Sequence, residues 1–149
     1  MESELNRESE LNRLLAALLV IAQGNLAKQD GFTPFALLLL ADSDSVQFAH
    51  REQPGEDAAS AMEAIQKWLK EQSLTGKYRA VGCCAQAEIE LQSPTRVVQA
   101  IFASLEHSSG EAFEAYIPFE KGDVYTYHDR IVLPQQPTMF KSGGSTNPG

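Results

Sequence analysis

Two adjacent cysteines form the most specific chemical signal in this sequence. Cys83 and Cys84 lie in the stretch YRAVGCCAQAEIEL at residues 78–91, and the chain has no other cysteine. Two neighbouring thiols could be a redox switch, half of a metal site, or two small residues packed in a sheet. A disulfide between them is geometrically awkward, because their Cα atoms lie about 3.8 Å apart, below the usual disulfide range. Zinc needs further ligands at wider spacing, and the sequence offers no second cysteine pair.

The strand-like pattern of residues 78–91 separates the two thiols. Successive side chains of a strand point to opposite faces of a sheet. Cys83 then shares its face with apolar residues, whereas the face of Cys84 becomes polar toward the end of the segment. Because a free cysteine often behaves as a small buried hydrophobic residue, we favour packing over redox or metal chemistry for this pair. Cys83 is predicted to be inert core, and Cys84 is the one thiol that stays a binding candidate.

The pair Glu106-His107 is the second candidate, since a carboxylate beside an imidazole can act as a general base or as a ligand. It directly precedes the turn-forming residues 108–110 (Ser-Ser-Gly), so we expect His107 to be a solvated surface residue. His50 and His128 also lie near strand ends, without triad partners or metal-binding spacing. The sequence lacks glycine-rich phosphate motifs and the G-x-S-x-G elbow. We therefore predict no catalytic residue, no metal ligand and no cofactor.

Hydrophobic periodicity predicts the elements that carry these residues. Apolar residues recur at helical spacing over residues 9–29, after the hexamer ESELNR has occurred twice in residues 2–13. A second helix is expected from about residue 58 to residue 73, after the break at Gln-Pro-Gly. The predicted strands cover residues 35–41, 46–50, 78–91, 96–106 and 112–119.

The predicted order of elements is α-β-β-α-β-β-β followed by a C-terminal extension. Short turns between the last strands favour antiparallel pairing, because parallel strands need long crossovers. We therefore predict an α+β fold in which one five-stranded antiparallel sheet packs against two main helices. Residues 1–140 would form a single domain with residues 1–8 as a frayed end, and residues 125–127 and 131–133 could add an edge strand. The small polar residues 141–149 predict a disordered tail.

Composition narrows the classes of function. The chain has 149 residues, 12 basic and 20 acidic side chains and a formal charge of -8. Binding to nucleic acid or to an anionic membrane surface is disfavoured, because both need clustered basic side chains. The longest apolar run, LLAALLVIA at residues 14–22, is far shorter than the span of about 20 residues that crosses a bilayer. The start of the chain does not resemble a secretory signal, so the cytoplasm is the expected location.

Three stretches resemble a known family. They are FTPFALLLLADSDSVQFA at residues 32–49, AIFASLEHSSGEAFEAYIPFEK at residues 100–121, and PQQPTMF at residues 134–140. They are similar to segments of a family of small uncharacterised bacterial α+β proteins with a "PF…L…DG" hairpin, an "LEH…G…PY" hairpin and a final "P…IF" segment. This chain departs from that pattern at Ser43-Asp44, where a turn glycine would stand, and at Phe119, where tyrosine is common. The resemblance implies a folded domain over about residues 32–140 and carries no site residues.

The order of elements also resembles roadblock-like and profilin-like domains, with the Pro-rich extension in place of a third helix. That resemblance implies a dimerising platform, at the level of fold analogy only. Our leading hypothesis is a non-catalytic protein-interaction module that forms a homodimer. Its basis is the helix at residues 9–29, whose wide apolar arc exceeds what one sheet is expected to cover.

Two alternatives remain open at the level of sequence. The first is a small-molecule binder or enzyme with a pocket between helices and sheet, for which Cys84, Glu106 and His107 are the weak candidate groups. The second is an acidic inhibitor or immunity-type protein, whose negative charge would steer it to a basic target such as a nuclease.

Overall fold

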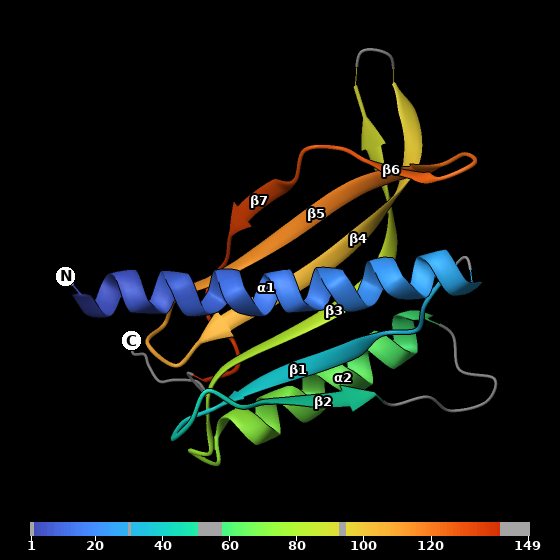
Figure 1. The fold of residues 1–149 in the computed structure, drawn as a ribbon. Coiled ribbons are helices and arrows are strands. Elements are labelled where there is room, and N and C mark those ends of the chain that lie inside the picture. The colour runs from blue at the N-terminus through green and yellow to red at the C-terminus, as the bar shows by residue number, and fades with distance from the viewer. Residues whose placement is uncertain (1, 30, 51–57, 93–94, 141–149) are drawn as a thin grey trace.

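The computed structural model describes residues 2–29, 31–50, 58–92 and 95–140. Within these ranges the chain forms two helices and seven strands (Figure 1). The helices are α1 (Glu2–Gln29) and α2 (Ala58–Ser73), and α1 includes both copies of the ESELNR hexamer. The strands are β1 (Phe35–Leu40), β2 (Val46–His50), β3 (Tyr78–Leu91), β4 (Arg96–His107), β5 (Ala112–Lys121), β6 (Tyr125–Tyr127) and β7 (Ile131–Pro134).

The strands form one open antiparallel sheet. Its order is β2-β1-β3-β4-β5-β6, and β7 also pairs with β5. Because β6 pairs with residues 119–121 and β7 with residues 113–116, the two short strands follow the same side of β5 one after the other. Turn geometry sets the ends of the long strands: Gly110, with φ 106°, lies in the turn where the His107 N–H donates to the Glu111 carbonyl. The sheet therefore has two outer edges. One is β2, and the other is formed by β6 and β7, which lie one after the other along β5.

The two helices lie on opposite faces of the sheet (Figure 1). Helix α1 contacts β1, β3 and β4, whereas α2 contacts β3 and β1. Strand alternation divides the core accordingly, since odd and even positions point to opposite faces. The α1-side core contains Phe35, Cys84 and Ile101, and the α2-side core contains Leu38, Ile65 and Cys83. Strand β1 and the first half of β3 are thus buried on both faces of the sheet.

The apolar arc of α1 is covered within one protomer. Its buried residues have exposed fractions of 8% or less and pack on the sheet; they are Leu11, Leu14, Leu15, Leu18, Leu19, Ala22 and Leu26. Helix and sheet approach closely at Gly82, where an added Cβ would lie 3.0 Å from Leu18 Cδ1. The outer side of the helix carries Val20, which is 70% exposed. The expected excess of apolar surface on this helix is therefore absent from its described residues.

The α+β class, the antiparallel pairing and the two main helices are confirmed, and the strand count is corrected. We predicted five strands, but the extension after β5 adds β6 and β7, because its residues continue to pair with β5. The extension then turns to the α2 side, where Met139 joins the core at 8% exposure. The predicted tail at 141–149 lies outside the described residues. Among the described residues, no helix has the length and apolar character needed to cross a membrane.

Candidate functional site

The two cysteines lie on opposite faces of β3, as the alternation predicts, and both are fully buried. Burial raises the pKa of the Cys83 thiol to about 12, and burial together with the neighbouring Cys83 raises the pKa of Cys84 as well. The polar residues on the Cys84 face lie further along the strand, whereas Cys84 itself is covered by the α1-side core. Because the thiolate is the reactive form, neither side chain is suited to redox or nucleophilic chemistry in the folded protein.

Glu106 is buried, with 5% of its surface exposed. It lies on the α2 side of β4, where its carboxylate accepts hydrogen bonds from backbone N–H groups of the C-terminal segment. The donors are Thr138, Met139 and Phe140, at distances of 2.8–3.1 Å. Such bonds satisfy a buried carboxylate without a cation, because charge-assisted hydrogen bonds are strong. Glu106 therefore fastens the end of the chain to the sheet.

His107 is also buried, at 7% exposure, and its ring is fully engaged on the α1 side. Nε2 lies 2.8 Å from Glu10 Oε1, and Nδ1 accepts the N–H of Ser109 at 3.1 Å. Since Nδ1 is an acceptor, the ring hydrogen lies on Nε2 and is donated to Glu10. A general base needs an acceptor nitrogen that is free and faces the substrate. Both ring nitrogens of His107 are already engaged in hydrogen bonds within the protein. The expectation of a solvated imidazole is thus corrected, because α1 covers the end of β4.

Glu10, which the sequence did not single out, is the centre of a polar network at this end of the sheet. Its Oε2 accepts from Arg79 Nε at 2.8 Å, and Arg79 donates further to the carbonyls of Leu40 and Ser43 and to Asp44. Burial alone would raise the pKa of Glu10, but the hydrogen bonds from His107 and Arg79 outweigh it, so this pKa lies below its usual value. Burial would lower the pKa of Arg79, yet its bonds to Glu10 and Asp44 raise it.

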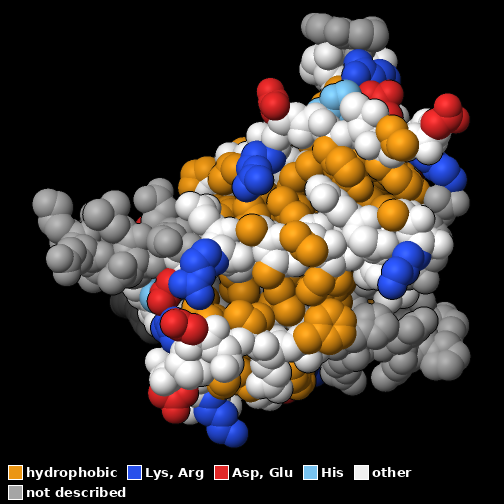
Figure 2. All heavy atoms as spheres, viewed as in Figure 1, with side chains coloured by type: hydrophobic (Ala, Val, Ile, Leu, Met, Phe, Trp, Pro, Cys, Tyr) orange, Lys and Arg blue, Asp and Glu red, His pale blue; other side chains and the backbone are white. Residues whose placement is uncertain are grey.

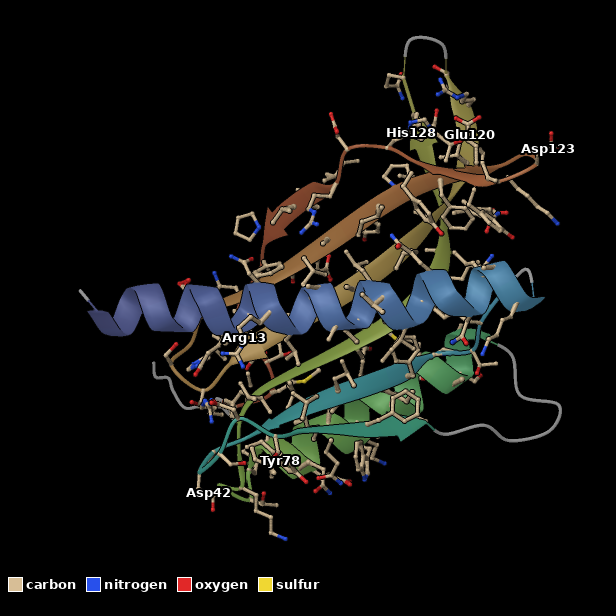
Figure 3. All side chains as sticks on the ribbon, in the orientation of Figure 1. Arg13, Asp42, Tyr78, Glu120, Asp123 and His128 are labelled. Carbon is tan, nitrogen blue, oxygen red and sulfur yellow. The ribbon has the colours of Figure 1, made fainter. Side chains whose placement is uncertain are left out.

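This network joins α1, the β1–β2 turn, β3 and the end of β4. Each member is satisfied by another member or by a backbone group, which is the pattern of a structural cluster. The remaining histidine with a described side chain, His128, lies beside Glu120, where Nε2 and Oε2 are 2.8 Å apart (Figure 3). Within the described ranges no group of His, Cys, Asp and Glu side chains could hold a metal ion.

The three candidate residues do not form one site. Cys84 and His107 belong to the α1 side, whereas Glu106, the neighbour of His107, points to the α2 side. Adjacent residues of a strand cannot act on one substrate from the same face. The sequence proximity of Glu106 and His107, which suggested an acid–base pair, therefore produces two separate structural contacts.

Among the described residues, one groove beside each helix is large enough to consider as a binding site. The larger, of about 460 Å³, lies between α2 and strands β4 and β5, and its lining includes Lys67, Lys70, Ser104 and Glu114. Glu106 borders it, but the carboxylate is engaged by the C-terminal segment. The smaller, of about 260 Å³, lies between α1 and strands β5 and β7. Its lining residues are Leu11, Asn12, Leu15, Glu111, Phe113, Arg130 and Val132.

Both outer edges of the sheet expose large apolar side chains. On β2, Val46 and Phe48 are 44% and 53% exposed. On β7, three consecutive residues, Ile131, Val132 and Leu133, are between 39% and 49% exposed. Natural proteins usually protect such edges with charges, prolines or covering elements, because an open edge can pair with another strand. Comparison with known proteins found no matching family model, no matching curated protein and no matching solved structure.

Proposed function

We propose that the protein is a non-catalytic interaction module that assembles as a homodimer through the outer edge of β2. The observation that carries the proposal is the apolar, uncharged edge formed by Val46 and Phe48, both of which point to the α1 side. Figure 2, viewed from that side, has hydrophobic side chains exposed beyond the helix over the β1–β2 part of the sheet. The apolar arc of α1, our original reason to expect a dimer, is covered by its own sheet and no longer supports one.

The backbone of β2 is oriented outward at the same residues. The Leu40 N–H donates to the Ser45 carbonyl at 3.0 Å, and the register places Gln47 opposite Leu38. Hydrogen-bonded and non-hydrogen-bonded pairs alternate along antiparallel strands. Val46 and Phe48 therefore turn their N–H and C=O groups away from β1. No other described strand pairs with this edge.

The pattern of β2 is complementary to itself. A two-fold axis at Gln47 would place Val46 of one protomer opposite Phe48 of the other, twice over, with both backbone pairs in hydrogen-bonding register. Aromatic and β-branched residues form favourable cross-strand pairs. The Gln47 side chain lies on the opposite face, where Tyr78 donates to its Oε1 at 2.9 Å, so it does not obstruct this contact. An interface of this kind is isologous, as in most homodimers.

Light scattering after size exclusion tests the proposal. The wild-type protein is expected at about twice the chain mass of 16.3 kDa. Phe48→Lys is expected at the chain mass itself, because it replaces the apolar contact with Val46 of the other copy and brings two lysines close together diagonally across the axis. Val20→Lys is the matched control, since Val20 is an exposed apolar residue of α1 away from the edge, and it should remain dimeric. A monomeric wild-type protein, or a dimer that survives Phe48→Lys, would sink the proposal.

Small-molecule binding is the second candidate, and the groove beside α2 favours it. Its volume of about 460 Å³ falls within the range of about 300–1,000 Å³ typical of ligand pockets. Lys67 and Lys70 on one wall suit a carboxylate ligand. Thermal unfolding with citrate and succinate tests this reading: stabilisation of the wild type that is lost in Lys67→Ala would support it. An unchanged unfolding temperature at high concentrations of both ligands would contradict this reading.

A further inference from the structure

The groove between α1 and β7 has the features of a peptide-binding site at the sheet edge opposite β2. We propose that it binds an extended segment of a partner protein, which pairs with β7 as an added strand. One large apolar side chain of the segment fills the groove, and a carboxylate two positions away, on the same face of the segment, pairs with Arg130. This site lies on a different edge from the proposed dimer contact, so each proposal can be tested independently of the other.

The size and lining of the groove fit one side chain. A volume of about 260 Å³ is below the range of about 300–1,000 Å³ typical of small-molecule pockets. Its walls are Leu11 and Leu15 of α1 with Phe113 and Val132 of the sheet, all of them apolar. Asn12 lies exposed at the rim on the helix side. A leucine- or phenylalanine-like side chain would therefore be held between helix and strand.

The backbone of β7 is oriented to receive a strand next to this groove. The Gln135 N–H donates to the Ala112 carbonyl at 3.0 Å, and the register pairs Val132 with Ala115. By the alternation of antiparallel pairs, Val132 turns its N–H and C=O away from β5. Val132 also lines the groove. A segment paired with Val132 would thus place alternate side chains on the α1 side, which is how strand addition combines affinity with specificity.

The charge of Arg130 indicates that the partner segment carries a carboxylate. Arg130 precedes β7 and lines the groove, and no acidic side chain of the described residues forms an ion pair with it. A guanidinium binds carboxylates through paired hydrogen bonds. Glu111, at the other side of the groove, would repel an acid, so the carboxylate of the segment is expected at the Arg130 end. The partner segment is therefore extended, with a large apolar residue two positions from an aspartate or glutamate.

A second copy of the chain is a poorer occupant. Residues 130–135 read RIVLPQ and contain no acidic side chain that could pair with Arg130 of the other copy. Ile131 and Leu133, the larger apolar residues of the strand, point to the α2 side by alternation and not into the groove. The sequence of β7 is thus not complementary to its own site, in contrast to that of β2.

Selection from a phage-displayed library of random eight-residue peptides on the immobilised full-length protein tests the inference. Enriched peptides are expected to share a large apolar residue two positions from an acid, flanked by strand-forming residues. The consensus peptide, labelled with fluorescein, should bind Arg130→Glu at least about tenfold more weakly. Replacing its acid by lysine should restore that affinity. Asn12→Trp, which fills the groove from the helix surface, should also lose binding, whereas Ala27→Trp, an exposed control on α1, should not.

Hydrogen exchange separates strand addition from other modes of binding. The Val132 amide should exchange more slowly when the peptide is bound, because its N–H gains a partner. The variants should melt at the wild-type temperature, which shows that lost binding is not lost folding. Four results would overturn the inference: no enriched motif, a motif without the acid, equal affinity for Asn12→Trp, or unchanged exchange at Val132. A Phe48→Lys variant that remains dimeric through β7 would assign this edge to a second copy instead.

Discussion

His107 Nε2 and Glu10 Oε1 lie 2.8 Å apart although the two residues are 97 positions apart in the chain. This hydrogen bond fixes the N-terminal half of α1 over the end of β4, and Arg79 completes the contact from β3. A pair that reads as acid–base chemistry in many active sites is here a fastening between helix and sheet. Its consequences are for stability, and they depend on pH.

Glu10→Gln should make the free energy of unfolding less dependent on pH in the acidic range. The pKa of Glu10 is lowered in the folded state from its usual value of 4.5, so its contribution is complete above that pH and is lost as the pH falls through the folded value. We expect Glu10→Gln to cost about 1 kcal/mol in the free energy of unfolding at pH 7. The difference from wild type should shrink as the pH falls below 4.5 and through the lowered pKa of folded Glu10. Urea unfolding at several pH values measures this, and a constant difference would contradict it.

Glu106→Ala should release the C-terminal segment from the sheet. It leaves the buried N–H of Met139 and its neighbours at Thr138 and Phe140 without their acceptor, at a cost of about 1–3 kcal/mol. Amide exchange at residues 138–140 should accelerate in the variant, and urea unfolding gives the loss of stability. Glu106→Gln keeps an acceptor and should lose less. Glu114→Ala, on the same face of the adjacent strand, is the control and should leave that exchange unchanged.

Both thiols should resist labelling in the native protein. Cys83 and Cys84 are fully buried, and the pKa of Cys83 is about 12, so almost no thiolate is present at pH 8. With a chromogenic disulfide reagent, neither should react until the protein unfolds, and both should then react together. Cys84→Ser should cost about 1–3 kcal/mol, because a hydroxyl replaces an apolar thiol in the core. Rapid labelling of native Cys84 would show that α1 does not cover it.

Two glycine substitutions should have opposite effects. Gly82→Ala would place a Cβ 3.0 Å from Leu18 and 3.3 Å from Leu105, so these buried leucine side chains must move, at a cost of about 1–3 kcal/mol. Gly24→Ala lies in α1 with nothing within 4 Å of the added Cβ, and it should stabilise the protein by about 0.5–1 kcal/mol. Thermal unfolding of both variants measures the contrast. A neutral Gly82→Ala would mean that α1 packs less closely on β3.

The candidate site was less predictable from sequence than the fold. The turn residues after His107 indicated that its side chain is exposed to solvent. Whether a residue at a strand end is buried depends on which element covers it. Here that element is α1, which comes from the other end of the chain. Glu10 lay within a repeated hexamer and carried no signal of its own. The groove beside β7 was also invisible in the sequence, because its walls combine residues 11–15 with residues 111–132, which only the tertiary structure brings together.

The sequence by itself determined the α+β class, the two main helices, the antiparallel strands and the separation of Cys83 from Cys84. These features follow from periodicity, which is local: apolar spacing distinguishes helix from strand, and alternation assigns neighbouring residues to opposite faces. The tertiary structure decided which faces and edges are covered. It buried Cys84, Glu106 and His107, paired β6 and β7 with β5, and placed no further described strand beside β2 or β7. Those outcomes depend on contacts between distant segments, which no local pattern encodes.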